Sequence, residues 1–203
     1  MQLLERILKN SIELFRKYGI KRVTTDDIAK EVGISKRTLY ENFKDKEEIV
    51  KGCIEYFTNE KKKEVMDIIN KSENVIEAVY KICKWGEEIR KSFNPLFFED
   101  LKRYHYKIYD ETIKKSSLKT NNIQLLLKKG INEGNFKKGL NSEIIAIFID
   151  EVVKIMHNEE IFNLNIYNEK DLFNNIIMPY FIGISSDKGK ELIEKYFNQH
   201  LQL

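Results

Sequence analysis

Residues that interrupt helices, cross-link chains or anchor them in membranes are scarce in this sequence. Only two prolines and nine glycines occur among 203 residues, so long helices are possible over most of the chain. The two cysteines, Cys53 and Cys83, fit a reducing cytoplasm, as core thiols rather than as a disulfide or a metal pair. The longest apolar run, Ile144 to Ile149, is six residues, far too short to cross a bilayer. The chain starts with a charged stretch and not with a signal peptide, so we expect a cytoplasmic protein with no membrane partner.

Motifs of common catalytic sites are also missing. The three histidines, His105, His157 and His200, lie on different helical patterns. The sequence contains no G-x-S-x-G, H-E-x-x-H, phosphate-binding loop or dinucleotide fingerprint. We therefore expect that the protein is not an enzyme and has no catalytic residue, no cofactor and no metal site.

The composition is that of an ordered, mostly helical protein, with 42% hydrophobic and 33% charged residues. The net charge is only +3, but it is unevenly distributed. Residues 1–52 hold 12 Lys and Arg against 9 Asp and Glu, so they carry the whole excess. A modest basic segment of this kind is the footprint that DNA binding requires.

Residues 24–46 have the layout of a helix-turn-helix, the motif whose second helix enters the major groove of DNA. Two short helical patterns, Asp26–Val32 and Lys36–Phe43, flank a turn at Gly33. Glycine adopts the left-handed conformation of such a turn without the steric cost of a Cβ atom. The spacing therefore predicts two helices joined by a sharp turn.

Polar residues at the expected helix starts can supply the caps. Thr24 or Thr25 can accept a hydrogen bond from a free N–H of the first helix, and Ser35 can do so for the second. Asp45, with Glu48 three residues later, is an acidic variant of a capping box and starts the following helix.

Helical periodicity continues on both sides of the motif. An amphipathic helix is expected before Gly19, and a connecting helix over residues 47–70. Further helical patterns cover about residues 75–94, 96–104, 108–134, 141–157, 169–184 and 187–199. Weak helix formers at residues 116–122 allow a break, and Pro179 would kink or shorten its helix. We predict an all-α fold, with a three-helix DNA-binding domain at residues 1–46 and a larger helical domain at 47–203.

Many positions in the first quarter of the chain have the spacing of one known family. They are Phe15, Gly19, Thr24, Thr25, Ile28, Ala29, Val32, Gly33, Ile34, Ser35, Thr38, Leu39, Tyr40, Phe43, Lys46 and Ile49. This pattern resembles the TetR-type, or AcrR-type, transcriptional regulators. The family often has glycine or alanine in place of Arg37 and histidine or tyrosine in place of Asn42, so the operator sequence is not predictable. The resemblance implies that residues 108–134 form one helix.

The outward face of the second motif helix consists of residue types that contact DNA. We expect eight residues to contact a double-stranded operator: Thr25, Lys36, Arg37, Thr38, Tyr40, Glu41, Asn42 and Lys46. Lys36 and Arg37 suit guanine O6 and N7, whereas Glu41 and Asn42 suit cytosine and adenine. Thr38 can reach a base or a phosphate.

The remaining three residues are phosphate contacts by resemblance to the family. Tyr40, Lys46 and Thr25 would fix the position of the protein on the duplex without reading its sequence. The alternative is a helix-turn-helix that serves only for packing.

Two apolar segments near the C-terminus, residues 144–155 and 172–180, are candidates for a homodimer interface. They are apolar around more than one face, and a palindromic operator requires a two-fold dimer. The expected interface residues are Ile145, Phe148, Ile149, Val152, Val153, Leu172, Phe173, Ile176, Ile177 and Tyr180. The resemblance implies a four-helix bundle made by two helices of each subunit, and a buried core within one chain is the alternative.

Aromatic residues are frequent in the middle of the chain. A core is the more common use of such residues, but the resemblance implies that a small-molecule effector binds among these helices. The candidate effector residues are Trp85, Phe93, Phe97, Phe98, Tyr104, His105, Tyr109 and Phe148. We expect a DNA-binding repressor that acts as a homodimer and is released by its effector; the rival is a helical small-molecule binding protein without operator recognition.

Overall fold

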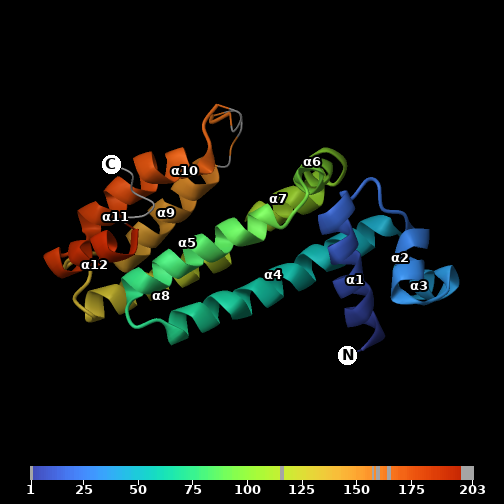
Figure 1. Ribbon diagram of the computed structural model, residues 1–203, viewed down its shortest axis with the longest axis horizontal. Helices are drawn as coiled ribbons and strands as arrows, with labels where there is room; N and C mark the ends of the chain where they lie inside the picture. Colours follow the sequence, from blue (N-terminus) through green and yellow to red (C-terminus); the bar gives the residue numbers. More distant parts are fainter. Residues whose placement is uncertain (1, 115–116, 157, 159–160, 164–165, 198–203) are drawn as a thin grey trace. The chain divides into compact units, whose positions relative to one another are not determined.

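The computed structural model describes residues 2–114, 117–156, 158, 161–163 and 166–197 (Figure 1). The helices are α1 (Leu3–Tyr18), α2 (Thr25–Val32), α3 (Lys36–Asn42), α4 (Lys46–Lys71), α5 (Val75–Lys91), α6 (Pro95–Tyr104), α7 (Tyr106–Lys114), α8 (Ser117–Asn132), α9 (Ser142–Met156), α10 (Glu169–Leu172), the π-helical turn η1 (Phe173–Ile177), α11 (Met178–Ile184) and α12 (Asp187–Phe197). An isolated antiparallel bridge pairs Phe136 with Ser185. The prediction of an all-α fold with an N-terminal helix-turn-helix and a helical C-terminal part is confirmed.

The described residues form two compact units. The first unit contains those of residues 1–66 and 85–114, and the second contains those of residues 67–84 and 115–203. Helices α4 and α5 each contribute residues to both units.

The core of the first unit forms around the inner face of α1. Ile7 and Phe15 of α1 are fully buried, and they share a hydrophobic cluster with Leu39 of α3 and Ile49 of α4. Helix α1 contacts both α2 and α6. The predicted amphipathic helix ends at Gly19, whose φ of 83° is unfavourable for any residue with a side chain.

The start of α4 differs in one detail from the expected capping box. The Asp45 side chain accepts a hydrogen bond from the Glu48 N–H at 2.9 Å, as predicted. Glu48, however, reaches one residue further back than expected and accepts from the N–H of Lys44 at 2.6 Å. Both carboxylates lie at the positive end of the helix dipole, where negative charge is stabilising.

The second unit has its own core, in which Val75, Ile76, Met178 and Phe197 are almost fully buried. Asn141 opens α9, because its side chain accepts from the N–H groups of residues 143 and 144.

The helical pattern predicted over residues 169–184 is present, but its hydrogen bonding changes in the middle. The N–H of Met178 donates to the carbonyl of Phe173, five residues earlier, in the π-helical turn that precedes Pro179. Proline has no N–H and its ring conflicts with the preceding turn, which explains why the regular α pattern is interrupted at this point.

Continuity of the helix predicted over residues 108–134 depends on residues 115 and 116, which lie outside the described residues. The described parts on either side are α7 and α8. The predicted ends near residues 157 and 199 also fall on residues that are not described.

Candidate DNA-binding site

Helix α2 begins with a reciprocal cap between Thr24 and Asp27. The Thr24 hydroxyl accepts from the Asp27 N–H at 3.2 Å, and Asp27 accepts from the Thr24 N–H at 2.8 Å. The hydrogen bonds from Thr24 lower the pKa of Asp27, because they stabilise its charged form. Thr24 is thus the capping residue, which leaves Thr25 available for another contact.

The turn between α2 and α3 is fixed by its backbone. Gly33 has the left-handed φ of 72° and ψ of 42°, and the N–H of Ile34 donates to the Ala29 carbonyl at 2.9 Å. Ser35 then caps α3 by accepting from the N–H of Thr38 at 3.0 Å. These local bonds satisfy free backbone groups at both helix ends and set the direction of α3.

Helix α3 turns one face to the core and the other to solvent. Leu39 is fully buried, whereas five of the predicted DNA-contacting residues are exposed: Lys36, Arg37, Tyr40, Glu41 and Asn42. The predicted contacts Thr25, Thr38 and Lys46 are partly buried. The structure therefore brings the predicted base-reading side chains onto one exposed surface.

The two cations of α3 are both paired with carboxylates. The Lys36 ammonium lies 2.8 and 3.1 Å from the two carboxylate oxygens of Asp26, on α2. Arg37 donates from Nε to Glu41, one turn along α3, at 3.0 Å. The exposed face of α3 therefore combines both signs of charge.

The predicted phosphate contacts have partners within the protein. The hydroxyl groups of Thr25 and Tyr40 lie 3.2 Å apart, which joins the start of α2 to α3. The Lys46 ammonium donates to the Ile20 carbonyl at 2.6 Å, and its partial burial lowers its pKa. Lys46 therefore holds the loop before α2, a role that sequence reasoning did not assign to it.

Helix α6 holds the other side of this loop. The buried carboxylate of Asp100 accepts from the Lys21 N–H at 2.7 Å. Asn94 donates from its backbone to the Arg16 carbonyl at 2.8 Å and from its side chain to the Lys17 carbonyl at 3.1 Å. Neither Asp100 nor Asn94 was among the predicted site residues, because their partners are about 80 residues away in the sequence.

The predicted dimer residues divide into buried and accessible sets. Ile145 and Leu172 are buried within the second unit, so they belong to its core rather than to an open surface. Phe148 is exposed and lies against the ring of Tyr180, with 4.8 Å between the centroids. The other predicted residues are partly buried: Ile149, Val152, Val153, Phe173, Ile176, Ile177 and Tyr180.

Exposed apolar residues that the prediction left out lie beside Phe148 on the same helix. They are Ile144, Ile147 and Ile155, with 64%, 51% and 45% exposure. Their spacing along α9 places them with Phe148 on one side of the helix.

The predicted effector residues of the first unit belong mainly to an aromatic cluster. Phe93 and Phe97 are buried, and their ring centroids are 4.7 Å apart. Phe98 packs on both rings although it is exposed. Tyr109 is partly buried against the same core, and Tyr104 is exposed. Phe148, the last of the predicted effector residues, lies in the second unit.

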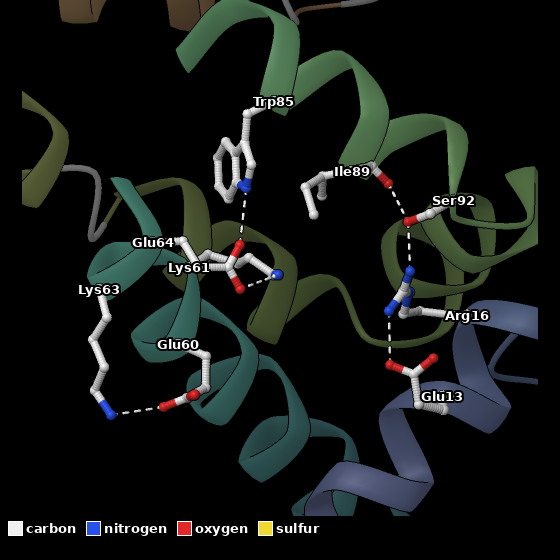
Figure 2. A network of polar contacts seen from close by, with 9 residues as sticks. All are labelled: Glu13, Arg16, Glu60, Lys61, Lys63, Glu64, Trp85, Ile89 and Ser92. Carbon is white, nitrogen blue, oxygen red and sulfur yellow. Dashed lines mark hydrogen bonds and ion pairs between the residues drawn. The ribbon is translucent and has the colours of Figure 1, made fainter. Parts of the chain in front are cut away.

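Trp85 and His105 are the two predicted effector residues with unusual polar surroundings. Figure 2 shows the Trp85 ring on α5 pointing toward α4, where its Nε1–H donates to Glu64 at 2.8 Å. Lys61 bonds to the same carboxylate at 2.6 Å. The buried Nδ1 of His105 has no hydrogen-bond partner among the described residues, and burial lowers the pKa of this histidine.

Two surface hollows lie along α1. One has a volume of about 310 Å³ and is bordered by Arg16 and Ser92; the other has about 490 Å³ and is bordered by Arg22 and Lys30. Arg16 is held there by Glu13 and Ser92, as Figure 2 shows. Neither hollow is lined by the predicted effector residues.

Comparison with known proteins agrees with this geometry. Residues 7–53 match the family of bacterial regulatory proteins, tetR family. The HTH-type transcriptional regulator YvaF of Bacillus subtilis is 26% identical over 188 residues, which cover 91% of this chain and 96% of YvaF. The negative regulator IcaR of the biofilm operon icaADBC in Staphylococcus aureus is 40% identical over 80 residues, which cover 37% of this chain and 41% of IcaR.

The same fold occurs in solved structures. A TetR-family transcriptional regulator from Agrobacterium tumefaciens aligns with a TM-score of 0.61 and 16% identity over 91% of this chain and 98% of that protein. A capped helix-turn-helix with an exposed polar second helix is the arrangement of DNA-binding regulators of transcription. The N-terminal segment of the chain therefore matches the tetR-family model, and the chain as a whole is similar to TetR-family regulators of transcription.

Regulators of this family bind DNA and act as dimers. The similar proteins carry the names of transcriptional regulators. Across the described residues, no helix is both long enough and apolar enough to pass through a membrane.

Proposed function

We propose that this chain is a cytoplasmic repressor that binds a palindromic operator as a homodimer and leaves it when a small-molecule effector binds. The observation that carries the proposal is the exposed polar face of α3, held in place by the buried Leu39. The similarity to IcaR, a negative regulator, supports repression rather than activation.

The division of labour that we propose follows the predicted domains. Residues 1–46 contact DNA, and residues 47–203 bind the effector and the second subunit. Residues 85–114, which pack in the same compact unit as the helix-turn-helix, would pass a change in the effector-binding part to the loop before α2.

The exposed apolar side of α9 supports a dimer. Ile144, Ile147, Phe148 and Ile155 would each expose a large apolar surface to water in a single chain. A contiguous apolar surface of this kind marks a protein interface, and a two-fold axis beside α9 would bury it against its own copy. Tyr180 would extend the interface from α11.

The effector is proposed to bind near Trp85, where apolar and polar groups meet. The indole ring is partly buried, and the Glu64 carboxylate and the Lys61 ammonium lie next to it. Such a combination of an aromatic wall and a few polar groups is typical of small-molecule sites. An effector would release DNA only if it bound better to the state that does not bind DNA.

A gel-shift series with the upstream DNA of the chain's own gene, at two salt concentrations, tests operator binding. We expect a specific complex that weakens steeply as salt rises, because Lys and Arg side chains displace counterions from phosphates. A protein that binds small molecules without recognising an operator would show no preference for this DNA over a random duplex. That outcome would favour the rival function.

Trp85 provides the test of effector binding because it is the single tryptophan of the chain. Mass spectrometry of small molecules that co-purify with the protein would supply candidates. An effector that binds near the indole should change its fluorescence in a saturable titration and dissociate the DNA complex over the same concentration range. A compound that releases DNA without changing the fluorescence would place the effector site elsewhere.

A further inference from the structure

Asp26 holds the ammonium of Lys36 with both of its carboxylate oxygens, at 2.8 and 3.1 Å. Asp26 lies in the first turn of α2, where its neighbour Asp27 forms the reciprocal cap with Thr24. The carboxylate of Asp26 pairs with Lys36 instead. Lys36 is the first residue of α3, and both side chains are more than half exposed. The hydrogen bond from Lys36 to Asp26 raises the pKa of the lysine and keeps it charged.

The second ion pair of the recognition helix is built differently. Arg37 uses Nε–H for its bond to Glu41, and the side chain is 87% exposed. A guanidinium has five N–H donors in a planar fork, so the bond at Nε steadies the side chain and leaves the terminal nitrogens for guanine O6 and N7. The Lys36 ammonium has three donors at one point, and two carboxylate oxygens already lie beside them.

A backbone phosphate is negatively charged and a base edge is neutral, so the Asp26 carboxylate repels the phosphate but not the base edge. A phosphate that approaches Lys36 brings a negative charge close to the Asp26 carboxylate, which repels it. The O6 and N7 atoms of guanine are neutral acceptors, so they can share the ammonium with Asp26 without this repulsion.

We propose that Asp26 is a specificity-determining residue, which makes Lys36 select the neutral edge of a guanine over a backbone phosphate. The inference rests on the proposed operator binding and deepens it. In this arrangement Lys36 contributes little to binding of random DNA, and its contribution appears only where the operator presents a guanine. Asp26 thus lowers affinity for DNA in general and raises the ratio of operator to random binding.

A double-mutant cycle of Asp26→Asn and Lys36→Gln tests the proposal. Binding of the full-length variants to a random-sequence duplex and to the gene's upstream DNA is measured over a range of salt concentrations. Glu31→Gln is the matched control, because Glu31 is an exposed carboxylate on the same helix, and thermal unfolding checks that each variant is folded.

Asp26→Asn should tighten binding to the random duplex by up to about fivefold, the range expected for release of an exposed ion pair. It should also steepen the slope of log K against log salt by about 0.9, the value for one added phosphate contact. Adding Lys36→Gln should cancel both gains. Lys36→Gln alone should leave the slope on the random duplex unchanged while weakening the operator complex.

Two results would overturn the inference while leaving the proposed function intact. One is an equal gain on random DNA from Glu31→Gln, which would indicate a general effect of net charge. The other is a slope on random DNA that flattens by about 0.9 in Lys36→Gln alone, because Lys36 would then already contact a phosphate. Absence of any salt-dependent DNA binding by the unmodified protein would overturn the proposed function and this inference together.

Discussion

Arg37 on α3 and Lys46 at the start of α4 differ in what they are expected to contribute to DNA binding. The bond from Nε of Arg37 to Glu41 orients the guanidinium, and its two terminal nitrogens can then bind the edge of a base. Lys46 is partly buried and bonded to the Ile20 carbonyl, so it positions the loop before α2, and its ammonium has further donors for the predicted phosphate contact. These two residues should therefore respond differently when they are replaced.

Arg37→Ala should cost about 1–3 kcal/mol on the operator and much less on a random duplex, because only the base contact is lost. Lys46→Ala should weaken binding to both DNAs and flatten the salt slope by about one, as expected for a phosphate contact. Fluorescence anisotropy with both duplexes over a salt series measures these changes. Equal losses of Arg37→Ala on the two duplexes would contradict its role as a base reader.

His105 predicts a dependence of stability on pH. Burial lowers its pKa below the ordinary value of 6.5, whereas Glu47 and Asp100 act in the opposite direction and Lys46 in the same one. The folded state therefore favours the neutral ring more than the unfolded state does. The contribution of His105 to the free energy of unfolding is therefore present above pH 6.5 and is lost as the pH falls through the lower pKa of the folded state.

Urea denaturation at pH 7.5 and pH 5.5 measures this contribution. The free energy of unfolding should fall with acidification in the unmodified protein and fall less in His105→Gln, which cannot titrate. The difference between the two proteins isolates His105 from all other titrating groups. Identical pH dependence in both would contradict the assignment.

At the scale of elements, Asn94 joins the end of α1 to the start of α6. Its side-chain oxygen accepts from the Leu96 N–H at 3.0 Å and caps α6, while its side-chain nitrogen donates to the Lys17 carbonyl at 3.1 Å. Pro95 follows at the first position of α6, where the missing N–H has no cost. One side chain therefore satisfies free groups at two helix ends.

Asn94→Ala should lower the free energy of unfolding by about 1–2 kcal/mol, the usual cost of losing an N-cap. Asn94→Asp keeps the cap acceptor but cannot donate to Lys17, so it should recover only part of the loss. Urea denaturation of the three proteins measures both effects. Full stability of Asn94→Ala would show that α1 and α6 do not depend on this side chain.

Local signals predicted the elements of the helix-turn-helix well. Gly19, Gly33, Ser35 and Asp45 each act on backbone groups within a few residues, so their effect can be inferred without knowing the tertiary structure. The sequence analysis did not identify Asn94 as the cap of α6, nor its bond to α1. Contacts within one turn of a helix depend on spacing alone, which the sequence states directly.

Contacts between elements were beyond the reach of that reasoning. The pairing of Lys36 with Asp26 and of Lys46 with Ile20 depends on how α2, α3 and α4 pack. Helix α9 is apolar on several sides, so periodicity could not tell the buried Ile145 from the exposed Ile144. The use of the aromatic residues as core or as effector pocket likewise depends on packing rather than on residue type.

At the scale of the whole molecule, the proposed function requires a second copy of the chain. Phe148→Glu places a charge in the centre of the exposed apolar side of α9 and should convert a dimer into monomers. Tyr106→Glu, on the 62% exposed Tyr106 of α7, is the control and should stay dimeric. Sedimentation analysis measures both, and a Phe148→Glu protein that remains dimeric would exclude α9 from the interface.

The central claim is that two copies of α3 enter successive major grooves of one duplex. Hydroxyl-radical footprinting on the upstream DNA tests it directly. We predict two symmetric protected half-sites, whose centres are one helical turn of about 10–10.5 base pairs, or a multiple of it, apart. Protection of a single half-site, or a footprint that Arg37→Ala leaves unchanged, would contradict the account.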